Sequence, residues 1–597
     1  MNGHDDRYPA IGAYALLADG AGAALVSAQG GIDWCCLPRI DSGSSFGRLL
    51  DWDRAGHCYF GPTAAKVQRS RDYIDDTLVL CTDVTQGGAH ARVYDFMVLP
   101  REGAEVPHEL VRIAEGVTGE LTFGLELRPR FDYGTVAPWM RRHSPDTWSA
   151  TGGDDAMVIW SDVELELKGH HELVGRCTVR AGDRRRLVLR HAAPEALDDE
   201  PAWGPERCDA RLKETLRNWR RWAKRISSDD AGVRRSVLVL HALTNGRTGG
   251  MAAAATTSLP ESVMGRTWDY RYCWIRDSTF ATRALAEVGC GTEADAFRRF
   301  IQRSSAGTAE DLQILYGVHG ARRIGEQELT ELEGWRGIGP VHIGNGATGQ
   351  FQLDAYGELV NLAWRWHERG NSPDDDLWRF LVTLVDHAAE RWREPDRGIW
   401  EWRPRPRHWV HSKALCWTSL DRGLRLAEEC MRKAPMTRWR KERAAVRRAI
   451  ERDGYDRKRG VFVNWFGGRQ MDASLLQLPV TGFVEWDDER MIRTTDAVRE
   501  ELNDKGLIRR YRVKDGQPGR EGAFLACSFW LVECLARQGR RSEAREAYDA
   551  AMATANDLGL FSEEFDTRSE EMMGNFPQAL THLSHIAAHV ALDESEG

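Results

Sequence analysis

The chain has 597 residues, of which 42% are hydrophobic and 29% are charged, and this globular mixture excludes a disordered, collagen-like or fibrous protein. Lys and Arg number 81 and Asp and Glu number 90, which gives a net charge of −9. An acidic chain lacks the positive surface of a general nucleic-acid binder, and it gives no reason to expect adhesion to an anionic membrane.

The first 200 residues have the pattern of an antiparallel β-sandwich. Short apolar runs alternate with glycine-containing turns such as Gln29-Gly30-Gly31 and Gln86-Gly87-Gly88. We expect strands at 23–27, 77–82, 92–97, 121–127, 157–160 and 187–191. Many strands without intervening helices favour two packed sheets, and we place this domain at residues 1–200.

The hydrophobic period then changes from strand to helix. Residues 205–226 form a basic amphipathic pattern with Leu212, Leu216, Trp219 and Trp222 on one side. Because this helix stands between two segments of different period, we interpret residues 201–230 as a linker between domains.

From residue 231 onward the pattern is helical throughout. It predicts twelve helices, at 231–243, 277–289, 292–304, 350–369, 374–392, 412–432, 435–453, 471–477, 485–502, 521–538, 541–555 and 575–592. Twelve helices favour an (α/α)6 barrel over residues 231–597. The long, polar and aromatic segments all precede even-numbered helices, so they should open at one end of the barrel and form a cleft there.

Other sequence features bear on location and cofactors. Residues 1–30 lack a basic segment followed by an apolar core, and no run of about 20 apolar residues exists. The twelve cysteines include the adjacent pair Cys35 and Cys36 and form no zinc-type pairs. We therefore expect a cytoplasmic protein with reduced thiols, without a metal or other cofactor.

The segment before the sixth predicted helix contains a carboxylate between two indoles, Trp400-Glu401-Trp402. Desolvation of Glu401 would raise its pKa and keep it protonated near neutral pH, as a general acid requires. Nearby arginines would oppose this by favouring the ionised form: Arg403, Arg405 and Arg407. A glutamate beside tryptophans can also be purely structural.

A second acidic group precedes the twelfth predicted helix. Glu563 and Glu564 lie between the apolar pair Leu560-Phe561 and Phe565, which favours partial burial over a solvated surface. If the long segments share one end of the barrel, these acids face the region of Glu401. Two carboxylates across a cleft are the minimum requirement for glycoside hydrolysis.

The segment before the second predicted helix combines aromatic rings with an arginine–aspartate pair. Trp274, Arg276 and Asp277 fit a forked polar clamp on sugar hydroxyls beside an aromatic wall. The alternative is that Asp277 only caps the helix and that Arg276 lies at the surface.

Two other motifs point to chemistry that their context does not support. The run Gly344-Asn345-Gly346-Ala347-Thr348-Gly349 satisfies GxGxxG, but no βαβ unit surrounds it, so dinucleotide binding is disfavoured. The triplet His170-His171-Glu172 lies in the β region and lacks the spacing of a zinc-binding helix.

The chain resembles glycoside hydrolase family 15, which includes glucoamylases, glucodextranases and trehalases. The matching stretches run in family order along nearly the whole chain: IGAYALLADG, GGIDWCCLPRIDSGSSFGRLLD, TTSLPES, WDYRYCWIRDS, NGATGQFQLDAYGE, GIWEWR, RHWVHSKALCW, MDASLLQLPV, EGAFLACSFWLVECL and EEFDTRSEEMMGNFPQALTH. The resemblance implies a β-sandwich followed by an (α/α)6 barrel. It also implies hydrolysis of a terminal α-glucosyl linkage with inversion at the anomeric carbon.

Site residues follow from the resemblance position by position. Glu401 matches the general acid and Glu563 matches the general base that activates water. The family's substrate-binding positions correspond to Arg276 and Asp277, to Trp400, and, in a loop that aligns poorly, to Arg510. An inverting enzyme would hold the two carboxyl groups about 6.5–9.5 Å apart, leaving room for the water.

The substrate and some alternatives remain open at this point. A saccharide is the expected partner, with trehalose slightly preferred over α-1,4- or α-1,6-glucans because no starch-binding module is recognisable. The chain departs from the family pattern at Gly346 and at 348–349, which lie at the cleft and bear on substrate choice. A phosphorylase on the same plan would need a phosphate site in place of Glu563. A glycan-binding protein without catalysis would keep the tryptophan-rich cleft. The sequence does not indicate an oligomeric state.

Overall fold

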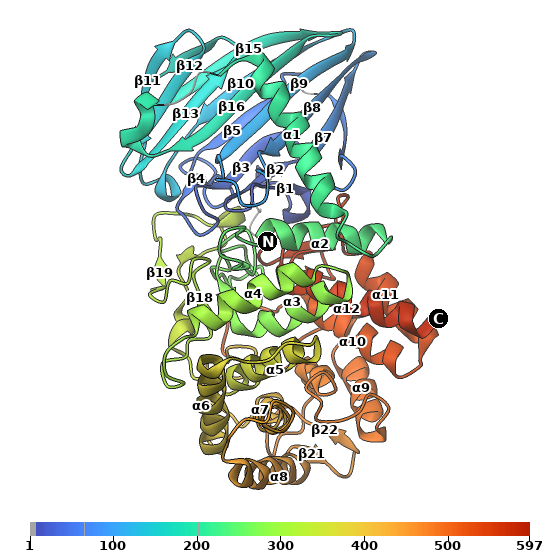
Figure 1. Ribbon diagram of the computed structural model, residues 1–597. Coiled ribbons are helices and arrows are strands. Elements are labelled where there is room, and N and C mark those ends of the chain that lie inside the picture. The colour runs from blue at the N-terminus through green and yellow to red at the C-terminus, as the bar shows by residue number, and fades with distance from the viewer. Residues whose placement is uncertain (1–6, 65, 200–202, 597) are drawn as a thin grey trace.

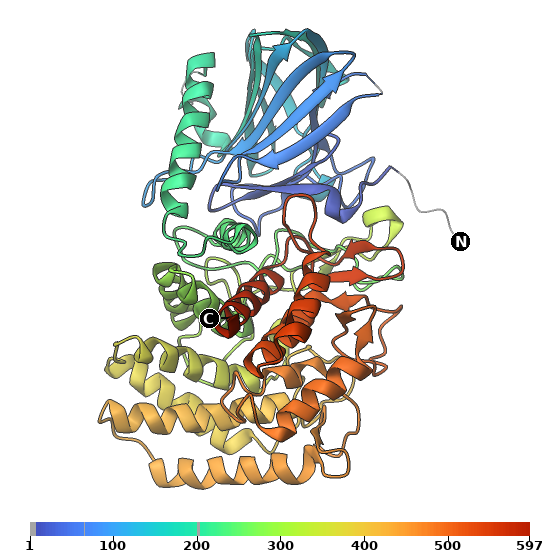
Figure 2. The same ribbon diagram turned by 90° about the vertical axis from the view of Figure 1, so that its right-hand side faces the viewer.

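The computed structural model describes residues 7–64, 66–199 and 203–596. Figures 1 and 2 show a two-sheet part at one end of the molecule and a helical part at the other. The predicted β-sandwich followed by an all-α barrel is confirmed. The expected boundary between residues 200 and 201 lies outside the described residues.

The N-terminal part consists of two antiparallel eight-stranded sheets that pack face to face. The first has the order β1 (Tyr14–Ala18), β2 (Ala23–Ser27), β3 (Gly31–Cys36), β5 (His57–Pro62), β10 (Glu120–Arg128), β15 (Glu172–Arg180) and β14 (Leu165–Lys168), with β4 (Ser44–Phe46) paired to β3. The second has the order β11 (Trp139–Ser144), β12 (Thr147–Gly152), β13 (Asp155–Ser161), β16 (Arg184–Ala192), β9 (Glu109–Thr118), β8 (Ala89–Met97), β7 (Leu80–Gln86) and β6 (Gln68–Tyr73).

Alternation of apolar and polar residues places the core between the sheets. In β10 every second residue is buried, namely Leu121, Phe123, Leu125 and Leu127, and the residues between them are more exposed. A strand with this period buries one face against a second sheet.

A single long helix, α1 (Pro205–Ala223), connects the sandwich to the helical part (Figure 1). Asp209 pairs with Arg186 of β16, and near the end of the helix Trp222 stacks on His241 of α2 (Ala231–Leu243) at 3.8 Å between ring centroids. The helix therefore contacts both parts of the molecule.

The helical part is a closed double ring. The inner ring runs in the order α3 (Ile275–Glu287), α5 (Asp354–Glu368), α7 (Val410–Glu429), the 3-10 helix η6 (Ala473–Gln477), α10 (Leu525–Arg537) and α12 (Ala579–Glu596), which returns to α3. The outer ring consists of α2 and of α4 (Gly291–Ser304), α6 (Asp375–Arg391), α8 (Met436–Asp453), α9 (Glu489–Glu501) and α11 (Arg541–Met552).

One predicted helix differs from the structure in type, and four begin four residues later than predicted, namely α5, α9, α10 and α12. The eighth, at 471–477, is the short 3-10 helix η6, because Asp472 accepts hydrogen bonds from the Ser474 backbone and hydroxyl and closes a tight turn. Pro479, which has no N–H, follows closely. The tenth, at 521–538, begins only at Leu525, because the strand β25 (Ala523–Phe524) pairs with β26 (Glu564–Asp566).

Buried polar contacts join the sandwich to the segment that leads into α3. Trp34 of β3 donates from its indole nitrogen to the Ala255 carbonyl at 2.8 Å. Arg271 pairs with Asp269 at 2.6 Å and also donates to the Ser42 carbonyl at 2.7 Å. Both members of the ion pair are buried, so they satisfy each other in place of water.

The cysteines and the character of the helices complete the description of the fold. All twelve cysteines lie in the described part of the chain and are unpaired. Among the described helices, none combines the length and the apolar character needed to cross a membrane.

Candidate active site

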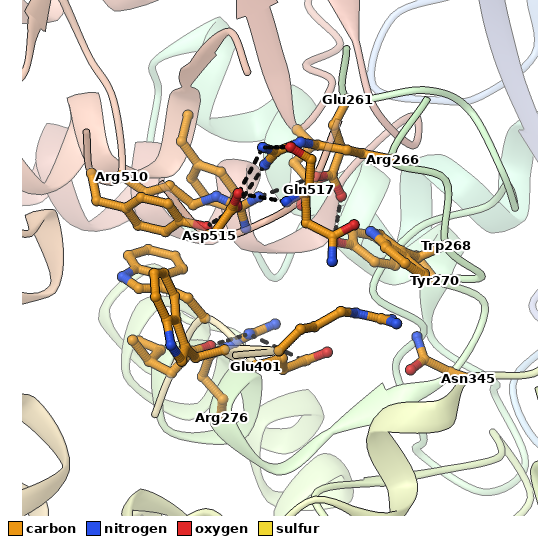
Figure 3. Close-up of a pocket in the computed structure, with 17 residues that line it drawn as sticks. Glu261, Arg266, Trp268, Tyr270, Arg276, Asn345, Glu401, Arg510, Asp515 and Gln517 are labelled. Carbon is orange, nitrogen blue, oxygen red and sulfur yellow. Dashed lines mark hydrogen bonds and ion pairs between the residues drawn. The ribbon is translucent and has the colours of Figure 1, made fainter. Parts of the chain in front are cut away.

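A pocket of about 680 Å³, open to solvent, lies at one end of the barrel. Figure 3 shows Glu401 and Arg276 on one side of the pocket and Glu261, Arg266 and Arg510 on the other. The remaining lining residues are Trp268, Tyr270, Asn345, Ile399, Trp400, Trp402, Arg403, Tyr511, Asp515, Gln517, Phe524 and Glu563.

Apart from Phe524, the lining residues come from five of the six long segments that precede the inner helices. These segments are 245–276, 305–349, 393–411, 503–520 and 556–574. No residue of the described segment 457–470 lines the pocket, although its Trp465 packs on Trp402 with ring centroids 6.3 Å apart. Five of the long segments therefore meet at one pocket, and segment 457–470 packs against a residue that lines it.

Glu401 is held by a tight turn. Its backbone N–H donates to the Gly398 carbonyl at 3.1 Å, and Glu401 itself has a left-handed φ of 55°. Gly398 also has a positive φ, and a Cβ there would lie 2.7 Å from the Trp409 ring. Non-glycine residues with positive φ are uncommon and cluster at functional sites.

Burial and two neighbours set the protonation of Glu401. Burial raises its pKa, whereas the Arg276 guanidinium, 3.9 Å away, and the Trp274 indole favour the ionised form. The Trp274 N–H donates to Oε1 at 2.7 Å. Oε1 is thus an acceptor, so a proton on this carboxyl group belongs on Oε2.

Glu563 lies at the start of a small sheet. Its carbonyl accepts from the Leu525 N–H at 3.0 Å, and the next residue begins β26, which pairs with β25 and with β27 (Glu571–Met573). A Cβ on Gly574 would lie 2.8 Å from Glu563 Oε2, so only glycine leaves room for this carboxylate. Within the described residues, Oε2 makes no hydrogen bond.

The surroundings of Glu563 are strongly acidic. Burial raises its pKa well above the usual value, and the negative charge of Glu261 raises it further. Arg510 and the Tyr270 hydroxyl act in the opposite direction. Whether Glu563 is ionised therefore depends on the charges of these neighbours.

The predicted arginine–aspartate pair stands at the start of α3. Arg276 Nε donates to Asp277 Oδ1 at 2.8 Å, and its Nη1 donates to the Ile399 carbonyl at 3.1 Å. Arg276 lines the pocket, whereas Asp277 and Trp274 do not. Asp277 accepts a hydrogen bond from Arg276, and Trp274 donates one to Glu401. The interpretation of Arg276 as a surface residue beside a capping aspartate is wrong.

Trp400 and Arg510 form the adjoining surface. The Trp400 N–H donates to Asp472 Oδ1 at 2.8 Å, and its ring stacks on Trp530 at 5.8 Å between centroids. The Arg510 guanidinium lies 5.8 Å from the Trp400 ring centroid, and its Nε donates to Glu521 Oε2 at 2.9 Å.

Sequence reasoning did not single out the charged cluster beside Glu563. One carboxylate oxygen from each of Glu261, Glu521 and Glu564 lies within 4.8 Å of the other two, a spacing that suits a cation. In this cluster a guanidinium supplies the positive charge, since Arg510 Nη2 lies 3.1 Å from Glu261, 3.9 Å from Glu564 and in contact with Glu521. Arg266 binds Glu521 as well. Contacts between segments 249 residues apart leave no signal in local sequence patterns.

The glycine-rich motif serves the pocket in a different way from nucleotide binding. Its residues Gly346–Gly349 form a 3-10 helix that the Asn345 side chain caps, and Asn345 itself lines the pocket. The short strands before it, β19 (Gln327–Glu328) and β20 (His342–Ile343), pair antiparallel, so no βαβ unit is present there.

Comparison with known proteins places both parts of the chain. Residues 228–590 match glycosyl hydrolases family 15, and residues 3–194 match the trehalase-like N-terminal domain. The trehalase of Mycobacterium tuberculosis is 36% identical over 99% of this chain and 91% of its own length. The trehalase of Thermoplasma volcanium is 32% identical, covering 99% and 94%.

Solved structures give the same fold. The chain aligns with a bacterial glucoamylase complexed with acarbose at a TM-score of 0.76, covering 100% of this chain and 96% of that one, with 12% sequence identity. With the family match over most of the barrel and full-length relatives above 30% identity, the chain belongs to glycosyl hydrolase family 15 and is a glycoside hydrolase.

Proposed function

We propose that this protein is a trehalase that hydrolyses α,α-trehalose with inversion, with Glu401 as general acid and Glu563 as general base. The observation that carries the reaction is that both carboxyl groups line one pocket, in surroundings of opposite character. Trehalose as the substrate is supported by the trehalases that are similar along both the sandwich and the barrel.

The environment of each carboxyl group suits its proposed role. Burial raises the pKa of Glu401, which favours the protonated form that a general acid needs, and Oε2 is the oxygen that would protonate the glycosidic oxygen. Glu563 Oε2 makes no hydrogen bond within the described residues and can accept one from the attacking water. Arg276 and Trp400 line the same pocket as these groups and would hold the terminal glucosyl unit through its hydroxyls and its apolar face.

Time-resolved proton NMR tests the proposal directly. Inversion at one anomeric carbon of trehalose releases one β-glucose, while the leaving sugar departs as α-glucose. We expect equal initial amounts of the two anomers, whereas retention would release α-glucose alone.

Parallel reactions with maltotriose and isomaltotriose, each with and without phosphate, separate the alternatives. A faster reaction on either glucan would replace trehalase by a glucan α-glucosidase. A glucose phosphate formed only with phosphate would indicate a phosphorylase. Absence of turnover on all three sugars would leave a glycan-binding protein.

A further inference from the structure

Glu261 is a buried carboxyl group in the pocket wall that the mechanism above does not use. It is 2% exposed and belongs to the segment before α3. Its Oε2 accepts from Arg510 Nη2 at 3.1 Å, and its Oε1 accepts from the Tyr270 hydroxyl at 3.3 Å. In Figure 3, Glu261 lies across the pocket from Glu401.

Tyr270 faces both Glu261 and Glu563. Its hydroxyl donates to Glu261 Oε1 at 3.3 Å, and it also lies close enough to Glu563 to lower the pKa of that carboxyl group. Burial and the surrounding carboxylates raise the pKa of Tyr270 well above its usual value, so the hydroxyl keeps its proton. A hydroxyl has one proton to donate, so it can donate to only one of the two carboxyl groups at a time.

We propose that Glu261 is a positioning residue that, through Tyr270, controls whether Glu563 is ionised. When Glu261 is ionised, it accepts the hydrogen bond from the Tyr270 hydroxyl, and its negative charge opposes the ionisation of Glu563. When Glu261 is protonated, it can donate to the Tyr270 oxygen, and Tyr270 then donates to Glu563. The second arrangement is the one that suits a general base. This role rests on the proposed function of Glu563.

Other charged groups contribute to the same balance. Burial raises the pKa of Glu261 to about 7, and the neighbouring charges act in both directions. The titratable or charged groups that face Glu261, Tyr270 and Glu563 are Arg266, Glu401, Arg510, Glu521 and Glu564. Tyr270 is hydrogen-bonded to Glu261 and also lowers the pKa of Glu563, so its hydroxyl acts on both carboxyl groups.

The test is the pH dependence of kcat for Glu261→Gln. The amide cannot ionise but can still donate to Tyr270, so the pKa of Glu563 should fall by about one unit. The acidic limb of the profile should move to lower pH, giving up to about tenfold more activity below the wild-type limb. KM should change by less than about threefold, because Glu261 acts through Tyr270 on Glu563 and not on the sugar.

The same substitution made in a Tyr270→Phe variant separates the effect that passes through the Tyr270 hydroxyl, here called the relay, from the effect of removing the charge of Glu261. In Tyr270→Phe the charge effect of Glu261→Gln persists but the relay is lost, so the shift should be at most about half as large. Glu521→Gln is the matched control, because Glu521 contacts both arginines without contacting Tyr270. Its shift should be the same in both backgrounds.

Two results would overturn the proposal: no shift in Glu261→Gln, or equal shifts in the tyrosine and phenylalanine backgrounds. Thermal unfolding of each variant shows whether it is folded. Failure of this inference is distinguishable from failure of the proposed function. If Glu563→Gln keeps activity, the role of the base is wrong, whereas an inactive Glu563→Gln with an unmoved limb in Glu261→Gln removes the relay alone.

Discussion

The carboxyl groups on the two sides of the pocket, Glu401 and Glu563, have neighbours of opposite charge. Glu401 faces one guanidinium and one indole N–H, and both favour its ionised form against the effect of burial. Glu563 is fully buried beside carboxylates, and Arg510 lies among them. The proton affinity of the proposed acid, Glu401, is thus set by a few direct contacts, and that of the proposed base, Glu563, by competition within a cluster of charged groups.

The largest effect should come from removing either carboxyl group. Glu401→Gln and Glu563→Gln should each lower kcat on trehalose by about 10³-fold, because each removes one partner of acid–base catalysis. Glucose release gives the rate, and thermal unfolding gives the control, since both amides keep the shape of the side chain. More than a tenth of the wild-type kcat in either variant would contradict the assignment.

A substrate with a good leaving group sharpens the contrast between the two residues. Departure of fluoride from α-glucosyl fluoride needs no strong general acid, so Glu401→Gln should recover most of its loss on this substrate. Glu563→Gln should stay inactive, because the water still needs a base. The reverse pattern would exchange the two roles.

The next effect concerns the arginine on the acid side. Arg276→Lys keeps the positive charge but cannot hold both Asp277 and the Ile399 carbonyl with one planar group. We expect kcat/KM to fall by about 10²-fold through misplacement of the sugar and the acid. Arg299→Lys, on the exposed side of α4, is the matched control and should leave kcat/KM unchanged. An equal loss in both variants would show that the effect is not local.

A smaller effect should follow from loss of the indole donor to Glu401. Trp274→Phe removes the hydrogen bond that favours the ionised acid, so the pKa of Glu401 should rise. The alkaline limb of the kcat profile then moves to higher pH, and kcat falls by no more than about tenfold. A limb that moves to lower pH would mean that the indole acts in the opposite sense.

The smallest effect should be on stability, at Glu564 on the base side. Its pKa is raised well above 4.5 by burial and by neighbouring carboxylates, so the folded state holds its proton more tightly than the unfolded chain does. The stability that this provides is full below pH 4.5 and is lost as the pH rises through the raised value.

In Glu564→Gln this loss is absent, so the Tm should fall less between pH 5 and pH 8 than in wild type, by about 2 °C. The exposed Glu546→Gln on α11 is the control and should follow wild type. Parallel curves for Glu564→Gln and wild type would show that Glu564 ionises in the folded protein much as it does in the unfolded chain.

The fold was predictable because its signals are local. Strand alternation such as that of β10 and the helical period after residue 231 each depend on neighbouring residues. Errors arose where a contact between distant segments replaced the local preference. Ala523 and Phe524 have a helical pattern around them, but they pair with β26 and delay the start of α10.

The site was predictable in part for the same reason. Glu401, Glu563 and Arg276 stand in conspicuous motifs, and the structure brings all three into one pocket. Glu261 lies in the stretch TTSLPES, which matched the family without pointing to a role for this residue, and the contacts of Glu261 and Arg266 are with Arg510 and Glu521, about 250 residues further on. Pairings over such distances cannot be derived from one sequence.

The ion pair between Asp269 and Arg271 connects one wall of the pocket to the N-terminal sheets. Arg271 also donates to the Ser42 carbonyl and to the Tyr133 hydroxyl of the sandwich. Tyr270 lies between the two members of this pair in the sequence, and Arg276 follows a few positions later. The N-terminal sheets thus hold one wall of the pocket in place, so we expect a barrel produced without them to keep its helices and to lose the alignment of the proposed reacting groups.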